Sequence, residues 1–227
     1  MSRWLEGLVV ATAMATGSAA AMTDGISYLA LGDSYTIGEA VDEDRRWPMQ
    51  LAAALRAEGI ALADPRIIAR TGWTNDELSA AMDAAEPLGE YGFVSLLIGV
   101  NNQYRGRDVA QYRTEFAALL DRAIGLAGGR ADRVIVLAIP DWGVTPFGAR
   151  SGRDTARVSA ELDAYNAAKR EETLARGVAF VDIAPVSRAE GGREVMVASD
   201  GLHPSGSLYA EWTALALPVA RALLARD

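Results

Sequence analysis

Short apolar runs alternate with longer amphipathic segments along this chain. The apolar runs are rich in Ile, Val, Leu and Phe and are bounded by turn-forming residues, which is typical of strands. We predict strands at 26–31, 66–69, 93–98, 134–139 and 178–181. The amphipathic segments have apolar residues at helical spacing, with proline or glycine near several of their ends. We predict helices at 47–58, 75–86, 108–127, 155–176 and 207–225.

The alternation of strands and helices indicates the fold class. Strands separated by helices form βαβ units, which produce a parallel sheet. Strands that are apolar throughout, such as 93–98 and 134–139, indicate a sheet covered by helices on both faces. We therefore expect an α/β fold. In such folds ligands bind at the carboxyl ends of the strands, so the loops that follow the strands are the first places to search for chemistry.

Composition fits one globular domain and narrows the possible chemistry. The 227 residues are 50% hydrophobic and 23% charged, enough for one sizeable core. A net charge of −8 argues against a nucleic-acid partner. The absence of cysteine excludes disulfides and thiolate catalysis, and the single histidine, His203, excludes a multi-histidine metal site. Lys169 is the only lysine, which we attribute to a compositional preference for arginine.

Residues 1–21 stand apart from this globular pattern. They combine an early arginine, an apolar stretch at 8–15 and three alanines at 19–21, as a secretory signal with its cleavage site does. Glu6 argues against that interpretation, and Met22 is an alternative start. A signal implies a periplasmic or secreted protein, whereas a start at Met22 implies a cytoplasmic one. The segment is too short and too interrupted for a transmembrane helix, so we expect no stable membrane insertion.

Four loops carry polar residues and glycines suited to catalysis. Three follow predicted strands, and the fourth precedes the last helix. In chain order these residues are Gly32-Asp33-Ser34, Gly72, Asn101, and Asp200 with His203. Taken singly, each has a structural explanation as a helix cap, a turn residue or a loop residue. The joint pattern favours a common site, because a parallel sheet brings such loops to one edge.

The residue types suit acyl transfer. A serine hydroxyl such as that of Ser34 needs a base within hydrogen-bond reach, and His203 is the only imidazole available. Asp200 lies three positions before His203, where a tight turn can place its carboxylate beside the ring. The developing oxyanion needs donors, for which the Ser34 and Gly72 amides and the Asn101 side chain are candidates.

These motifs, in this order, resemble those of the SGNH (GDSL-type) hydrolases. The matching residues are Gly32-Asp33-Ser34, Gly72, Gly99-Val100-Asn101 and Asp200-Gly201-Leu202-His203. The resemblance implies a flavodoxin-like three-layer α/β/α sandwich with about five parallel strands, formed by a single catalytic domain at 22–227. It also implies hydrolysis of carboxylic esters without a metal or organic cofactor.

The resemblance assigns roles to individual residues. Ser34 is implied as the nucleophile, His203 as the base and Asp200 as its partner, with the Ser34 and Gly72 amides and Asn101 forming the oxyanion hole. Tyr35 stands where the family name has leucine, and Asn102 follows Asn101 where many members have aspartate. There is no G-x-S-x-G motif, which disfavours the α/β-hydrolase fold.

The substrate is open at the level of sequence. Aromatic and proline residues on the loops are candidates for an acyl or aryl pocket, or else pack against helices: Trp73, Tyr104, Trp142, Pro146 and Phe147. Arg105 and Arg107 either meet an anionic substrate or are solvated. Two other functions fit the same fold: acyl transfer to an acceptor other than water, and non-enzymatic binding of a small ligand. No G-x-G-x-x-G or G-x-x-x-x-G-K-[ST] motif supports the binding function.

Overall fold

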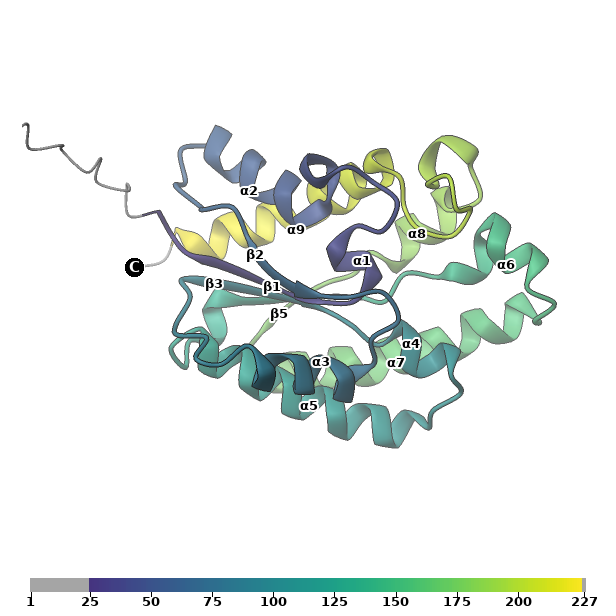
Figure 1. The fold of residues 1–227 in the computed structure, drawn as a ribbon, viewed down its shortest axis with the longest axis horizontal. Coiled ribbons are helices and arrows are strands. Elements are labelled where there is room, and N and C mark those ends of the chain that lie inside the picture. The colour runs from purple at the N-terminus through teal and green to yellow at the C-terminus, as the bar shows by residue number, and fades with distance from the viewer. Residues whose placement is uncertain (1–24, 226–227) are drawn as a thin grey trace, which may run out of the picture.

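The computed structural model describes residues 25–225 and shows a parallel sheet between two layers of helices (Figure 1). The expected signal segment at 1–21 lies outside the described residues. The sheet has five strands in the order β2-β1-β3-β4-β5, all parallel. The strands are β1 (Tyr28–Gly32), β2 (Arg66–Ala69), β3 (Phe93–Leu97), β4 (Val134–Leu137) and β5 (Ala179–Val181). This confirms the α/β fold and the number of strands expected from the sequence.

Long helices cover both faces of the sheet (Figure 1). One face carries α2 (Trp47–Ala57) and α9 (Gly206–Leu224), which pack against each other. The other carries α3 (Asn75–Ala84), α5 (Val109–Leu126) and α7 (Thr155–Ala175). The shorter helices are α1 (Ser34–Ile37), α4 (Val100–Tyr104), α6 (Pro146–Arg150) and α8 (Ala184–Glu190). Short 3-10 helices are η1 (Glu43–Arg45), η2 (Ala131–Arg133), η3 (Trp142–Val144) and η4 (Glu194–Met196).

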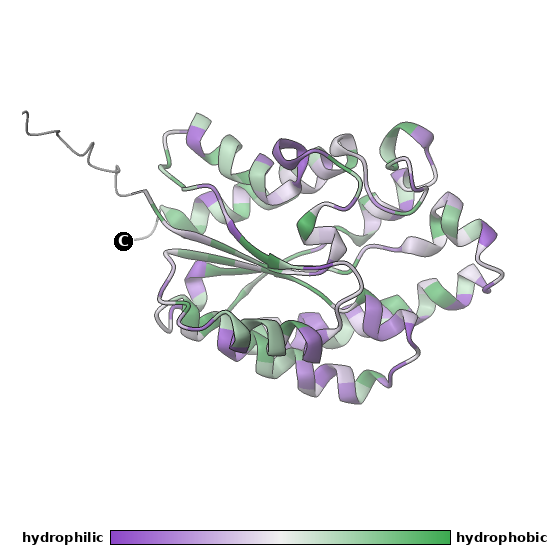
Figure 2. Cartoon of the chain, viewed as in Figure 1, coloured by the Kyte–Doolittle hydropathy of each residue, from purple (hydrophilic) through white to green (hydrophobic). Residues whose placement is uncertain are grey.

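Burial explains why the apolar runs form strands. Every residue of β1, β3 and β4 is buried, because helices cover both faces of these central strands. Both edge strands, β2 and β5, are partly exposed. Figure 2 shows the same division, with hydrophobic residues concentrated in the sheet and hydrophilic ones on the outer helix surfaces. The ten elements predicted from the sequence are all present, with ends that differ by no more than about two positions.

The sequence pattern does not reveal the short helices. Three of them, α1, α4 and α6, lie in loops that follow strands β1, β3 and β4. Helices of four or five residues are too short to show a helical period, so the pattern predicts only a loop. They occupy the carboxyl edge of the sheet, where the candidate site residues lie.

The strand order places the loops that follow β1 and β3 next to each other. The chain runs from β1 to its neighbour β2, then crosses to β3 on the other side of β1. This reversal is a topological switch point, where open α/β sheets form a crevice. Gly32 at the end of β1 is opposite Leu97 at the end of β3, so the residues that follow them, including Ser34 and Asn101, begin from adjacent positions.

We expect opposite effects from two glycine-to-alanine substitutions. A Cβ at Gly32 would overlap the Leu97 carbonyl oxygen and the Thr36 side chain, so G32A should destabilise the fold by about 1–3 kcal/mol. Gly125 is exposed in α5 and has open space at its Cβ position, so G125A should stabilise by about 0.5–1 kcal/mol. Urea unfolding of both variants measures this difference. Equal effects would contradict the close approach at the switch point.

Candidate active site

Ser34 lies at the start of a short helix that Asp33 caps. The Asp33 Oδ1 atom accepts a hydrogen bond from the Tyr35 amide at 3.0 Å, which makes Asp33 the N-cap of α1. Ser34 is the first residue of that helix and is 4% exposed. The capping explanation of this loop is therefore correct for Asp33, and it leaves the Ser34 hydroxyl free to face the pocket described below.

Asp200 and His203 form a closed turn before α9. The Asp200 Oδ2 atom is 2.5 Å from His203 Nδ1, and its Oδ1 accepts from the amides of Leu202 at 2.9 Å and His203 at 3.0 Å. Gly201 has a φ of +75°, a conformation that glycine adopts without strain. The His203 carbonyl accepts from the Ala198 amide at 2.7 Å, which holds the far side of the turn. This leaves Nε2 as the ring nitrogen that Asp200 does not bind.

The turn controls the charge of Asp200. Partial burial alone would raise the pKa of this carboxyl group, but the hydrogen bonds from the His203 ring and from the amides of Leu202 and His203 outweigh it. The pKa of Asp200 is therefore lowered from its ordinary value. An ionised Asp200 accepts from Nδ1–H, which fixes the tautomer of the ring and leaves Nε2 able to accept a proton.

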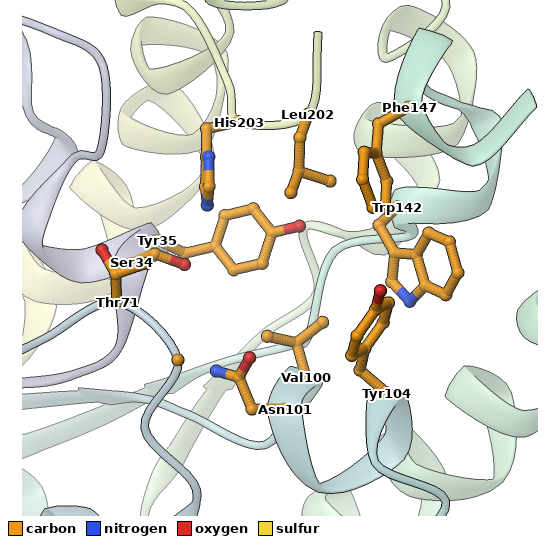
Figure 3. Close-up of a pocket in the computed structure, with 11 residues that line it drawn as sticks. Ser34, Tyr35, Thr71, Val100, Asn101, Tyr104, Trp142, Phe147, Leu202 and His203 are labelled. Atoms are coloured by element: carbon orange, nitrogen blue, oxygen red, sulfur yellow. The ribbon is translucent and has the colours of Figure 1, made fainter. Parts of the chain in front are cut away.

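Ser34 and His203 border the same pocket, which has a volume of about 230 Å³ (Figure 3). Its polar side also includes Thr71, Gly72 and Asn101. Its apolar side is formed by Tyr35, Val100, Tyr104, Trp142, Phe147 and Leu202. In Figure 3 the His203 ring points down into the pocket, on the side where Ser34 and Tyr35 lie. No hydrogen bond joins the Ser34 hydroxyl to the His203 ring among residues 25–225.

The two other oxyanion-hole candidates, Gly72 and Asn101, border the same pocket, and Figure 3 shows Asn101 on the opposite side from His203. Gly72 has a φ of +88°, and its carbonyl accepts from Arg105 Nη2 at 2.7 Å, which holds the loop in place. The Asn101 Nδ2 atom donates to the Trp73 carbonyl at 2.9 Å. Because an amide nitrogen carries two hydrogens, this bond orients the side chain and leaves one donor for a ligand.

Three of the five candidate pocket residues border the pocket, namely Tyr104, Trp142 and Phe147. Trp73 and Pro146 do not. The Trp73 ring packs against the core, and its carbonyl instead fixes Asn101.

Trp142 and Phe147 meet edge to face, with ring centres 6.0 Å apart. The indole N–H of Trp142 donates to Gln103 at 2.9 Å, and this hydrogen bond fixes the orientation of the indole ring in the pocket wall.

Arg105 and Arg107 are paired with carboxylates. Arg105 lies 3.1 Å from Glu77, and Arg107 lies 2.5 Å from Asp76. The hydrogen bond from Arg107 lowers the pKa of Asp76 to about 2. Both arginines therefore brace α3 and the loops around α4.

Asn102 is buried beneath the pocket loops, where it has a structural partner on each side. It accepts from the Asn75 amide at 3.1 Å and donates to Glu115 at 3.0 Å.

Sequence reasoning missed four pocket residues: Tyr35, Thr71, Val100 and Leu202. Val100 and Leu202 are the variable positions within two of the motifs, and Tyr35 and Thr71 are next to motif residues; that position is the only signal that could have found them. Tyr35 is the most informative, since its ring centre is 5.4 Å from that of His203. Tyr35, which stands where the GDSL motif has leucine, thus packs beside His203, the candidate base.

A comparison of the sequence with protein families decides the affiliation. The profile of the GDSL-like lipase/acylhydrolase family matches residues 30–210, which include all the motif residues. The chain belongs to the GDSL-like lipase/acylhydrolase family. A comparison with curated proteins finds no significant match.

Solved structures share the SGNH fold of this family. TesA has a TM-score of 0.68 at 19% identity, over 87% of this chain and 99% of that one. The esterase EstA from Pseudoalteromonas sp., inhibited by monoethylphosphonate, has a TM-score of 0.60 at 17% identity, over 88% and 94%. The acetylxylan esterase Axe2 from Geobacillus stearothermophilus has a TM-score of 0.63 at 16% identity, over 89% and 95%. At these identities the likeness establishes the fold.

Two further observations on this GDSL-like chain concern metal binding and membrane-spanning helices. Within residues 25–225, no group of three or more acidic or histidine side chains is placed to hold a metal ion. In the same part of the chain, the helices are all too short or too polar to span a bilayer.

We expect H203A to raise the pKa of Asp200 toward its ordinary value. The substitution removes the ring hydrogen bond and the ring charge, while the amide of residue 203 and that of Leu202 still donate. A carboxyl ¹³C titration by NMR measures the shift, with Asp76, held by Arg107, as the group that should not change.

The effect of H203A on the pH dependence of stability also has a predictable sign. Because the pKa of Asp200 is lowered in the fold, its carboxylate stabilises the protein at neutral pH and loses that contribution as pH falls through the folded value. H203A should therefore lose less stability in acid than the parent. An unchanged Asp200 titration would contradict the role of the ring.

Proposed function

We propose that this chain is a serine hydrolase that cleaves carboxylic esters through an acyl-enzyme. The observation that carries the proposal is the Asp200–His203 pair at 2.5 Å, on a pocket that Ser34 also borders. Membership of a family of lipases and acylhydrolases supports it. Two structures of the same fold are named as esterases, one of them inhibited by a phosphonate, which is consistent with this chemistry.

In the proposed reaction, His203 Nε2 takes the proton of the Ser34 hydroxyl while Oγ attacks the ester carbonyl. The ionised Asp200 stabilises the imidazolium that forms. His203 then donates the proton to the leaving alcohol. Water, activated by the same ring, attacks the acyl-enzyme and releases the acid. A positioned base of this kind is worth roughly 10²–10⁴ in rate.

The oxyanion of the tetrahedral intermediate is proposed to bind the amides of Ser34 and Gly72 and the remaining N–H of Asn101. Several contacts support this assignment. All three residues border the pocket, Arg105 holds the Gly72 loop and the Trp73 carbonyl orients Asn101. Each donor of this kind is worth about 2.7–4 kcal/mol in the transition state.

The walls of the pocket favour an apolar acyl or aryl group. Val100, Tyr104, Trp142, Phe147 and Leu202 form a surface with little capacity for hydrogen bonding. A volume of about 230 Å³ accommodates a compact group. The buried Trp142, fixed by Gln103, limits how deep that group can reach.

We expect S34A to abolish labelling by a fluorophosphonate probe and to lower ester hydrolysis by roughly 10⁴-fold or more. The reason is that Oγ is the proposed attacking atom. Hydrolysis of p-nitrophenyl butyrate and peptide mapping of the labelled protein measure both effects. S207A, which removes an exposed hydroxyl at the start of α9, is the matched control and should behave as wild type. Full activity in S34A would exclude the mechanism, whereas a wild-type protein without esterase activity or labelling would favour the binding function.

We expect F147A to shift substrate preference toward longer or bulkier acyl groups. Removing the ring opens one wall, and each methylene buried there is worth about 0.8 kcal/mol, or roughly fourfold in kcat/KM. A series of p-nitrophenyl esters measures the profile. F180A, which truncates a half-buried ring on β5 away from the pocket, is the control. Identical chain-length profiles in wild type and F147A would show that the acyl group binds elsewhere.

A further inference from the structure

One tyrosine of the pocket wall has a hydroxyl that the protein itself does not bind. Tyr35 borders the pocket together with Ser34 and His203 and is only 3% exposed. Its ring packs against two others, with its centre 5.4 Å from the centre of the His203 ring and 6.0 Å from that of the Trp212 ring. These contacts hold the ring, yet its hydroxyl forms no hydrogen bond with any of residues 25–225.

The Tyr35 hydroxyl is directed into the pocket. In Figure 3 the ring extends from the Ser34 side of the pocket toward Trp142, with the hydroxyl at the end nearer to Trp142. The hydroxyls of Tyr112 and Tyr209 also lack partners among the described residues, but they are sealed within the protein. The Tyr35 hydroxyl is not sealed in this way, so a ligand in the pocket can reach it.

The main pocket is the space from which a substrate can reach this hydroxyl. The Tyr35 ring also borders a second cavity, which has a volume of about 10 Å³ and holds nothing larger than about one water molecule. The main pocket, at about 230 Å³, has room for an acyl group. A substrate that meets the phenol therefore does so from the side of Ser34 and Asn101.

Tyr35 differs from the other polar side chains on the apolar side of the pocket. The indole N–H of Trp142 is already bound to Gln103, at 2.9 Å. Tyr104 is 40% exposed, so water competes with any ligand for its hydroxyl. On this side of the pocket, Tyr35 is thus the buried side chain that still has hydrogen-bonding capacity for a substrate.

The surroundings of Tyr35 favour a neutral partner. Burial, together with the charges of Asp33, Asp141 and Asp200, raises the pKa of Tyr35 well above its ordinary value, so the phenol keeps its proton. It can therefore both donate and accept a hydrogen bond, as a hydroxyl of a ligand can. The residues that line the pocket include no acidic, lysine or arginine side chain, so a charged substituent would lose its hydration there without gaining an ionic partner.

We propose that the pocket selects otherwise apolar acyl groups that carry a hydroxyl beyond the ester carbonyl, and that the Tyr35 hydroxyl recognises this group. The inference rests on the proposed ester hydrolysis at Ser34. With the carbonyl between Ser34 and Asn101, the acyl chain extends along the Tyr35 ring toward the phenol. An alkyl chain would cover the phenol and leave it unpaired, whereas a hydroxyacyl chain would bind it.

Two pairs of esters measure this recognition. In each pair a hydroxyl of the acyl group is replaced by a methyl group of similar size, so the two esters differ mainly in hydrogen bonding. The first pair is p-nitrophenyl 3-hydroxybutanoate and p-nitrophenyl 3-methylbutanoate. The second pair, p-nitrophenyl 6-hydroxyhexanoate and p-nitrophenyl heptanoate, places the hydroxyl farther from the carbonyl. The quantity compared is the ratio of kcat/KM for the hydroxylated ester to kcat/KM for its methyl counterpart.

Y35F removes the phenolic oxygen and retains the ring that packs against His203 and Trp212. We expect the ratio to be about tenfold higher in wild type than in Y35F for at least one of the two pairs. Because both esters of a pair use the same nucleophile and base, a general loss of catalysis in Y35F cancels in the ratio.

Y91F is the matched control. The Tyr91 hydroxyl accepts a hydrogen bond from Arg66 at 3.0 Å, and Tyr91 precedes β3, away from the pocket. Y91F should therefore have the ratios of wild type. The proposal is overturned if both ratios of wild type are equal to or below those of Y35F. That result would show that the Tyr35 hydroxyl does not contact the acyl group.

Binding to an inactive variant separates this proposal from the proposed function. Calorimetry of S34A and S34A/Y35F with the same esters should show that loss of the phenol weakens the hydroxylated ester by about tenfold relative to its methyl counterpart. If wild type neither hydrolyses the esters nor reacts with a fluorophosphonate, the proposed function is rejected, and the binding ratio still decides whether Tyr35 recognises a hydroxyl. If wild type hydrolyses the esters but Y35F changes neither the rate ratios nor the binding ratios, only the role of Tyr35 is rejected.

Discussion

The close pairing of β1 with β3 at the switch point is the constraint on which the site depends. Gly32 lies opposite Leu97, and a side chain at Gly32 would overlap the Leu97 carbonyl. Because the two strand ends approach this closely, the loop that carries Ser34 starts beside the loop that carries Asn101. The helices on both faces bury the central strands completely, so the carboxyl edge is where polar side chains of these loops can gather.

Within this edge, the candidate site residues are also structural residues. Asp33 caps α1, Asp200 accepts two amides of its own turn, and Asn101 binds the Trp73 carbonyl. Capping and catalysis are often weighed as competing explanations for serine and aspartate residues in loops. Here the hydrogen bonds that close the loops also orient the Asp200 and Asn101 side chains, so the structural explanation of these residues is compatible with the proposed catalytic one.

Buried charges at this edge fall into two kinds. The Asp141 carboxylate, behind the Trp142 wall, is compensated directly: it accepts from Arg188 at 2.8 Å and from Ser159 at 2.5 Å. Asp33 is fully buried, and its Oδ2 atom has no hydrogen-bond partner among the described residues. Incomplete satisfaction of a buried carboxylate is unfavourable for stability, and residues kept under such strain tend to lie at functional sites. Its position next to Ser34 agrees with that tendency.

The sequence by itself determined the layered α/β architecture, the ten main elements and the motif residues. Apolar runs, helical periodicity and turn residues are local features of a sequence, and strands that are covered on both faces must be apolar throughout. It also singled out His203 as the sole imidazole. Tertiary structure alone decided that Tyr104, Trp142 and Phe147 border the pocket whereas Trp73 does not, and that Arg105 and Arg107 brace loops. It likewise decided that Lys169, the only lysine, is buried and donates to the Leu137 carbonyl. The physical reason is that the burial of a side chain and its hydrogen-bond and ion-pair partners depend on strand order and helix packing, which bring together residues far apart in the chain.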